Sequence, residues 1–121
     1  MKKERRIKKA EEFREIIHKA EKTVSALYVV YFFPKKEALN RIGISVSKKL
    51  GNAVVRNRIK RQVRNIINET NALALDADLI VIVRKGYDPD DYASSKKCFQ
   101  TTLKHVTINK YHKGEDKNEV S

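Results

Sequence analysis

Apolar residues in the first third of the chain recur with two different periods, and each period predicts a different secondary structure. Helical spacing predicts a short amphipathic helix over residues 10–22. The run SALYVVYFF at residues 25–33 is rich in β-branched and aromatic residues and is followed by Pro34, which is typical of a strand. The apolar positions of the helix are Phe13, Ile16, Ile17 and Ala20, and one face of the strand holds Leu27, Val29, Tyr31 and Phe33.

Two further apolar patterns predict strands later in the chain. Residues 41–47, RIGISVS, alternate strictly, which indicates one buried apolar face and one open polar face. The continuous run LIVIV at residues 79–83 is typical of a strand covered on both faces. We expect the polar row of the first of these strands to lie beside the aromatic row of strand 25–33; its members are Arg41, Gly43, Ser45 and Ser47.

Two longer helices complete the prediction. Asn52 is a suitable N-cap for a helix running to about Thr70. A last helix is predicted to start at Asp88-Pro89, because a capping aspartate followed by proline favours a helix start. This helix runs to Val106, and its apolar face holds Tyr92, Phe99, Leu103 and Val106.

The element order predicts a single α+β domain in which helices pack on a short sheet. The 121 residues suffice for one modest core. We expect a flexible basic arm at residues 1–9, the domain at residues 10–106, and a disordered tail at residues 107–121, because the tail has little to bury.

The net charge of +12 resides entirely in the first half of the chain. Residues 1–64 carry 19 Lys and Arg against 6 Asp and Glu, whereas residues 65–121 carry 8 against 9. Such self-repulsion favours a polyanionic partner, with nucleic acid ahead of an anionic membrane surface. No apolar run approaches the roughly 20 residues of a membrane helix. The single cysteine, Cys98, is consistent with a reducing cytoplasm.

The cations of the predicted helix 52–70 gather on the side opposite its apolar stripe. On a helical wheel, Val55, Ile59, Val63 and Ile66 form the stripe. The opposite side carries Asn57, Lys60, Arg61 and Arg64, with Arg58 at its flank.

A solvated helix surface is the ordinary interpretation of such a pattern, but two features favour a polyanion. No Asp or Glu occurs between Gly51 and Asn68, whereas solvated faces usually mix charges of both signs. Arg56 and Arg58 also stand near the helix N-terminus, where the helix dipole favours anions.

The sequence offers no arrangement typical of an autonomous nuclease. Such an enzyme needs clustered carboxylates for a metal or a histidine base beside a nucleophile. The dense carboxylates Asp88, Asp90 and Asp91 are better explained as a helix cap and first turn. We therefore predict no catalytic residue and no metal ligand in this chain.

One block of the sequence closely resembles the signature of the protein subunit of bacterial ribonuclease P. The block runs from Ile44 to Arg61 and contains ISVSKK, GNAV and RNRIKR. The resemblance extends over roughly residues 5–106, through the helix with Phe13, the aromatic strand and the LIVIV strand.

The resemblance implies a fold and a function. The implied fold is like the second domain of ribosomal protein S5, with three helices, a small mostly antiparallel sheet of about four strands and a left-handed βαβ crossover. The fourth strand is expected near residues 23–26. The implied function is endonucleolytic removal of the 5′ leader from precursor tRNA by a cytoplasmic ribonucleoprotein. Its catalytic centre is an RNA that holds Mg²⁺, and this chain is expected to bind that RNA and the leader, but neither DNA nor a membrane.

The matching positions imply two binding surfaces. Contact with the RNA subunit is implied for Lys49, Arg56, Asn57, Arg58, Lys60, Arg61 and Arg64. A cleft for the leader is implied for Phe13, Ile17, Val29, Tyr31, Ser45 and Lys48. Ile17 stands where many members of the family have a second aromatic residue.

Two other functions are compatible with the residues alone. One is a general or ribosomal RNA-binding protein on a similar scaffold, which would be indifferent to a leader. The other is an independent metal-dependent nuclease, which would act without an RNA subunit.

Overall fold

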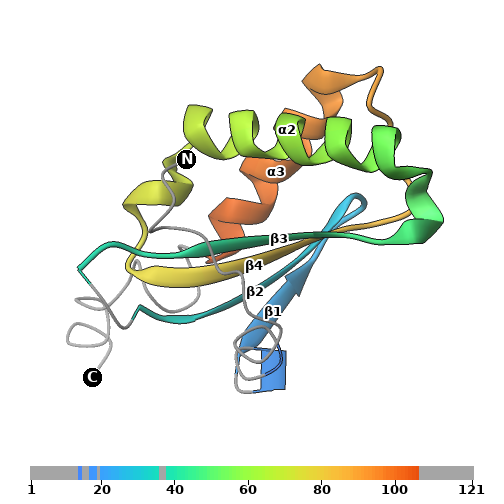
Figure 1. Cartoon of the computed structure of the whole chain (residues 1–121). Coiled ribbons are helices and arrows are strands. Elements are labelled where there is room, and N and C mark those ends of the chain that lie inside the picture. Colours follow the sequence, from blue (N-terminus) through green and yellow to red (C-terminus); the bar gives the residue numbers. More distant parts are fainter. Residues whose placement is uncertain (1–13, 15–16, 19, 36–37, 107–121) are drawn as a thin grey trace.

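The computed structural model describes residues 14, 17–18, 20–35 and 38–106 of the chain (Figure 1). Arg14, Ile17 and His18 are helical. The strands are β1 (Glu21–Val24), β2 (Tyr28–Pro34), β3 (Ile42–Val46) and β4 (Ala77–Val83). The long helices are α2 (Ala53–Glu69) and α3 (Tyr92–Val106), and the short 3-10 helices are η2 (Lys48–Leu50) and η3 (Asn71–Ala74).

The four strands form one mixed sheet in the order β1-β2-β4-β3. The pairs β1–β2 and β2–β4 are antiparallel, whereas β3 and β4 are parallel. The parallel pair is joined through α2, as parallel neighbours require a crossover connection. Both long helices lie on the same face of the sheet (Figure 1). The predicted α+β class and four-stranded sheet are therefore confirmed.

The hydrophobic core lies between this covered face and the two helices. Alternate residues of β2 point into it, and Tyr28, Val30 and Phe32 are completely buried. The inward stripe of α2 follows the predicted spacing. Ile59, Val63 and Ile66 are buried, Val55 is partly buried against the core, and the stripe extends to Ile67.

An aromatic cluster joins α3 to the sheet. The Tyr28 ring meets the Phe99 ring edge-on, with centroids 5.2 Å apart, and meets the Tyr87 ring at 6.1 Å. The Tyr28 hydroxyl donates a hydrogen bond of 3.0 Å to the Ser95 carbonyl oxygen. Burial raises the pKa of the Tyr28 phenol well above its ordinary value, so this hydroxyl remains a donor.

A second contact links the C-terminal end of α2 to the N-terminal end of α3. The Tyr92 hydroxyl donates to Glu69 Oε1 at 2.8 Å, and Lys96 Nζ lies 3.3 Å from the same oxygen. These two partners lower the pKa of the Glu69 carboxyl, the tyrosine having the larger effect. Partial burial, together with this bond, raises the pKa of Tyr92 to about 12. The predicted apolar face of α3 is confirmed, with Tyr92 at its partly exposed end.

The face of the sheet opposite the two long helices, here called the outer face, has its own small apolar cluster. Ile80 of β4 is completely buried there against Ile17, Ala20, Tyr31, Phe33 and Ile82. The prediction that the LIVIV strand is covered on both faces is confirmed at Ile80, although Ile82 remains partly exposed.

The boundaries of the first elements differ from the prediction. The helix expected over residues 10–22 cannot reach Lys22, because β1 begins at Glu21; Phe13 and Ile16 lie outside the described residues. The strand expected from Ser25 begins at Tyr28 instead. Ser25 closes a hairpin turn, in which its backbone N–H donates to the Tyr28 carbonyl oxygen at 2.8 Å. The short fourth strand exists, slightly earlier than expected.

The predicted start of the last helix is wrong by three residues. Asp88 Oδ1 accepts from the Asp90 backbone N–H at 2.9 Å, which forms a turn and not a helix cap. Asp91 is the cap of α3, because its Oδ1 accepts from the Ser94 backbone N–H at 3.2 Å. The proline after Asp88 favoured the earlier start, but in the structure this segment forms a turn whose Pro89 and Asp90 are hydrogen-bonded to Arg58 and Gln62 of α2.

None of the helices in the described part of the chain is long and apolar enough to cross a membrane.

Candidate nucleic-acid interface

The sequence between β3 and α2 folds into a compact double cap. The Ser47 Oγ accepts from the Lys49 backbone N–H at 3.1 Å and starts η2. The Asn52 Oδ1 accepts from the Val55 backbone N–H at 3.0 Å and starts α2, as predicted. Between them Gly51 has a φ of 145°, and a Cβ there would lie 2.9 Å from the Val55 Cβ. Glycine is therefore required, and the segment presents Lys48 and Lys49 to solvent.

The structure brings the predicted RNA-binding residues together on α2 and the segment before it. Asn57, Arg58 and Arg61 are exposed, and three further cations are partly exposed: Arg56, Lys60 and Arg64. Lys49 extends this group before the helix. These residues are called the basic face below. The buried stripe around Ile59 and Val63 lies on the other side of the helix.

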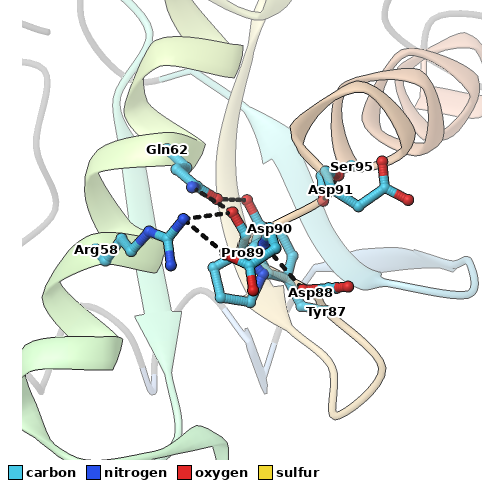
Figure 2. Close-up of polar contacts among 8 residues, drawn as sticks. All are labelled: Arg58, Gln62, Tyr87, Asp88, Pro89, Asp90, Asp91 and Ser95. Atoms are coloured by element: carbon cyan, nitrogen blue, oxygen red, sulfur yellow. Dashed lines mark hydrogen bonds and ion pairs between the residues drawn. The ribbon is translucent and has the colours of Figure 1, made fainter.

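One flank of α2 contacts the turn that connects β4 to α3 (Figure 2). Arg58 Nη2 donates to Asp90 Oδ1 at 3.0 Å and to the Pro89 carbonyl oxygen at 3.1 Å. One turn later, Gln62 Nε2 donates to the same carbonyl oxygen at 2.8 Å. The Gln62 Oε1 in turn accepts from the Tyr87 hydroxyl at 2.9 Å. Arg58 and Gln62 thus hold the turn between β4 and α3, which spans Tyr87–Asp91 and is called the clamped turn below.

The remaining cations of the basic face are differently placed. Arg56 Nε donates to the Gly51 carbonyl oxygen at 3.2 Å, which fixes the stem of its guanidinium. The side chains of Lys60, Arg61 and Arg64 make no hydrogen bond or ion pair with any residue that the structure describes. Cations without local acceptors retain their full capacity for phosphate oxygens.

The outer face of the sheet carries most of the predicted leader-binding residues. Val29 and Tyr31 of β2 and Ser45 of β3 all point to it, and Ile17 packs beside Tyr31 in the cluster around Ile80. Lys48 is exposed just beyond the end of β3. Phe13 lies outside the described residues.

The expectation that the aromatic row of β2 lies beside the polar row of β3 is wrong. Strand β4 lies between them, so Ile82 separates Val29 from Ser45 and Ile80 separates Tyr31 from Gly43. The face is therefore wider and more apolar than expected. Local alternation predicts which face a side chain takes, but it cannot predict a strand inserted between two others.

Lys22 is an outer-face residue that the sequence pattern missed. In β1 it stands in register with Tyr31, and its side chain is exposed. The helix predicted over residues 10–22 included this position, so the strand was not predicted there. The short EKTV segment gives too little alternation to predict a strand by itself.

The basic face and the outer face lie on opposite sides of the sheet. Helix α2 covers the face that carries Val30 and Val81, whereas Tyr31 and Ile80 point the other way. The segment Ser47–Leu50, which leads from β3 to α2, is the direct connection between them (Figure 1). No pattern in the sequence predicted this separation.

The aspartates of the clamped turn are engaged in structural contacts. Asp88 forms the turn, Asp90 pairs with Arg58, and Asp91 caps α3. No group of three or more His, Cys, Asp or Glu that could hold a metal ion occurs among the described residues. Cys98 is partly buried and packs against the core.

A cavity of about 500 Å³ lies between the C-terminal end of α2 and α3. Its walls include Asn71, Leu75, Lys97 and Leu103. None of the predicted site residues lines it, so it is separate from both candidate surfaces.

A small α+β domain with a basic helix face and partly exposed aromatic residues on its sheet is typical of the class of nucleic-acid-binding proteins. The family model Ribonuclease P matches residues 1–107 of the chain. The ribonuclease P protein component of Streptococcus agalactiae serotype Ia is 40% identical over 104 residues, covering 86% of this chain and 95% of that protein. That of Streptococcus pneumoniae serotype 4 is 40% identical over 118 residues, covering 97% and 96%.

Solved structures agree with this match. The Staphylococcus aureus RNase P protein superposes with a TM-score of 0.73 at 35% identity, covering 86% of this chain and 96% of that one. The RNase P protein from Thermotoga maritima gives a TM-score of 0.72 at 25% identity, covering 83% and 96%. The chain belongs to the ribonuclease P protein family. Its role is that of the protein subunit of this ribonucleoprotein endonuclease in tRNA processing, with the catalytic centre in the RNA. The alternative of a general RNA-binding protein is not favoured.

Proposed function

We propose that this chain assists the catalytic RNA of ribonuclease P through two separate surfaces. The basic face binds the RNA subunit, and the outer face of the sheet holds the 5′ leader of precursor tRNA. The proposal rests on the family membership and on the geometry of the two surfaces.

The proposed contact with the RNA subunit is electrostatic. Phosphates displace the counterions of the basic face, and each neutralised phosphate adds to the affinity and to its salt dependence. The observation that carries this proposal is that Lys60, Arg61 and Arg64 lie together on one helix without an acceptor among the described residues. The other proposed members are Lys49, Arg56, Asn57 and, at the flank, Arg58.

The proposed contact with the leader uses an open, mainly apolar surface. The partly exposed ring of Tyr31 stands among Ile17, Val29 and Ile82, which suits the stacking of unpaired bases. Ser45 and Lys48 offer polar contacts at the β3 end of this surface. Phe13 is a further member by resemblance alone.

We assign Mg²⁺ to the RNA subunit and its substrate, and not to this chain. The described residues include no cluster of three potential ligands, and the turn aspartates already have partners. The proposal has two further parts. For the fold, we propose a third helix near the N-terminus, a left-handed β3–α2–β4 crossover, a flexible arm at residues 1–9 and a disordered tail at residues 107–121. For the location, we propose the cytoplasm.

Reconstitution tests the proposed function directly. Adding the chain to a cognate catalytic RNA at low Mg²⁺ should restore cleavage of precursor tRNA, because the protein's cations offset phosphate repulsion that Mg²⁺ otherwise screens. The protein alone, assayed with Mg²⁺ or Mn²⁺, serves as the control and should be inactive. Failure to restore cleavage would refute the proposal, and activity of the protein alone would support an independent nuclease.

A further inference from the structure

The outer face contains two aromatic rings at a spacing that suits an extended single strand. Tyr31 and Phe33 are alternate residues of β2, so both point to this face, and both are partly exposed. Alternate residues of a strand are about 6.6 Å apart, nearly twice the 3.4 Å rise between stacked bases of one strand. Bases placed on both rings must therefore be separated from each other, as they are in a splayed single strand and not in a duplex.

A cation stands beside the first of these rings. Lys22 of β1 is the cross-strand partner of Tyr31 on the outer face, and it is exposed. Its side chain has no hydrogen bond or ion pair with the described part of the chain. Proteins that bind single strands combine aromatic stacking platforms with cations that follow the phosphate backbone.

The charge beside the second ring is of the opposite sign. Asp78 of β4 is the cross-strand partner of Phe33, and it is almost completely buried. Its Oδ1 accepts from the Arg41 backbone N–H at 2.7 Å, so the carboxylate has a structural role. The exposed cation therefore lies on the Tyr31 side of the pair of rings, which favours a phosphate there.

We propose that Lys22 and Phe33 belong to the leader-binding surface. Tyr31 and Phe33 stack on two consecutive unpaired nucleotides, and Lys22 binds the phosphate on the Tyr31 side. This inference rests on the proposed function of the outer face. It adds two residues that neither the helical pattern nor the resemblance assigned.

The test compares two substrates on the reconstituted holoenzyme. One is a precursor tRNA with a leader several nucleotides long, and the other is the same tRNA without its leader. Phe33→Leu keeps an apolar side chain but removes the ring, and it should weaken binding of the leader-bearing substrate roughly five- to hundredfold, the range for loss of one base–aromatic stack. Lys22→Ala should lower the salt slope for the same substrate by about 0.7, the value for one phosphate of a single strand. Binding of the leaderless tRNA should not change.

Two control variants make the outcome decisive. Tyr31→Leu tests the outer face itself, and Lys97→Ala removes an exposed lysine of α3 on the other side of the sheet. If Tyr31→Leu weakens leader binding while Phe33→Leu and Lys22→Ala do not, the inference is wrong and the proposed surface stands. If none of the three variants weakens binding of the leader-bearing substrate, the proposed function of the outer face is wrong. Equal losses for both substrates would also overturn the inference, and thermal unfolding of each variant identifies a loss of fold.

Discussion

The two flanks of α2 carry similar side chains in different states. On one flank, Arg58 and Gln62 make four hydrogen bonds to the clamped turn, which spans Tyr87–Asp91. On the other, Lys60, Arg61 and Arg64 make none with the described residues. The helical wheel placed Arg58 at the flank of the cationic side and Arg61 within it, but it could not show that Arg58 has partners within the chain. Arg61 therefore keeps all its side-chain donors for the proposed RNA contact, whereas Arg58 uses one of its guanidinium nitrogens within the chain.

The comparison also explains how α3 is placed. Pro89 and Asp90 are held by α2, so the chain reaches α3 with Asp91 in the capping position. An arginine inside the basic face thus helps to position a helix that carries none of the predicted RNA-binding residues. Arg58 combines a structural contact with a place at the margin of the proposed RNA surface.

The largest effect is expected from removing the cationic side chains that have no partner among the described residues. The triple variant Lys60→Ala, Arg61→Ala and Arg64→Ala should lower the salt slope of binding to the RNA subunit by about 2 to 3, at about 0.7 to 0.9 per lost phosphate contact. Filter-binding or fluorescence titrations over a range of salt measure the slope. Lys97→Ala is the control and should leave it unchanged; an unaltered slope in the triple variant would mean that these cations are merely solvated.

The next largest effect is expected at Gln62 and concerns stability. Gln62→Leu removes the acceptor of the Tyr87 hydroxyl and one donor to Pro89, both in a partly buried setting. An unsatisfied polar group of this kind costs about 1 to 3 kcal/mol of unfolding free energy. Urea unfolding measures the loss. Adding Tyr87→Phe removes the hydroxyl that Gln62→Leu leaves without its acceptor, and it should recover part of the lost stability. This account would be contradicted if the double variant lost more unfolding free energy than the two single variants together.

The smallest effect is expected from Arg58→Ala, which separates the two flanks most sharply. The Arg58–Asp90 pair is exposed, so its loss should lower the unfolding free energy by no more than about 1 kcal/mol. Because its donors are partly used within the chain, Arg58→Ala should also reduce the salt slope less than Arg61→Ala does. Asp90→Asn is the matched variant and should reproduce the stability change alone. Equal slope reductions for both arginines would abolish the distinction between the flanks.

Local patterns predicted α2 almost completely, because its cap at Asn52 and its buried stripe are encoded within one helix. They failed where distant contacts decide. Asp88-Pro89 has the stronger local signal for a helix start, but Arg58 and Gln62, about 30 residues away, bind Pro89 and Asp90 in a turn, and the helix is capped by Asp91. The insertion of β4 between β2 and β3 is likewise a non-local pairing, which alternation within a strand cannot reveal.

The candidate sites show the same division. The resemblance to the family and the wheel together identified the basic face, and alternation placed Val29, Tyr31 and Ser45 on one side of the sheet. The sequence did not reveal that Lys22 faces Tyr31, since β1 is only four residues long. Nor did it reveal that Arg58 is paired, because its carboxylate partner Asp90 lies in a distant turn.

The position of the two surfaces on opposite sides of one sheet has a consequence for assembly. A ribonucleoprotein must bring two polyanions close together, and their mutual repulsion opposes this. Here a layer of apolar side chains, from Ile80 on one side to Val81 and Ile59 on the other, stands between the proposed RNA sites. In the proposed complex, the leader and the RNA subunit therefore lie on opposite sides of this low-dielectric layer, and the segment Ser47–Leu50 connects the two surfaces.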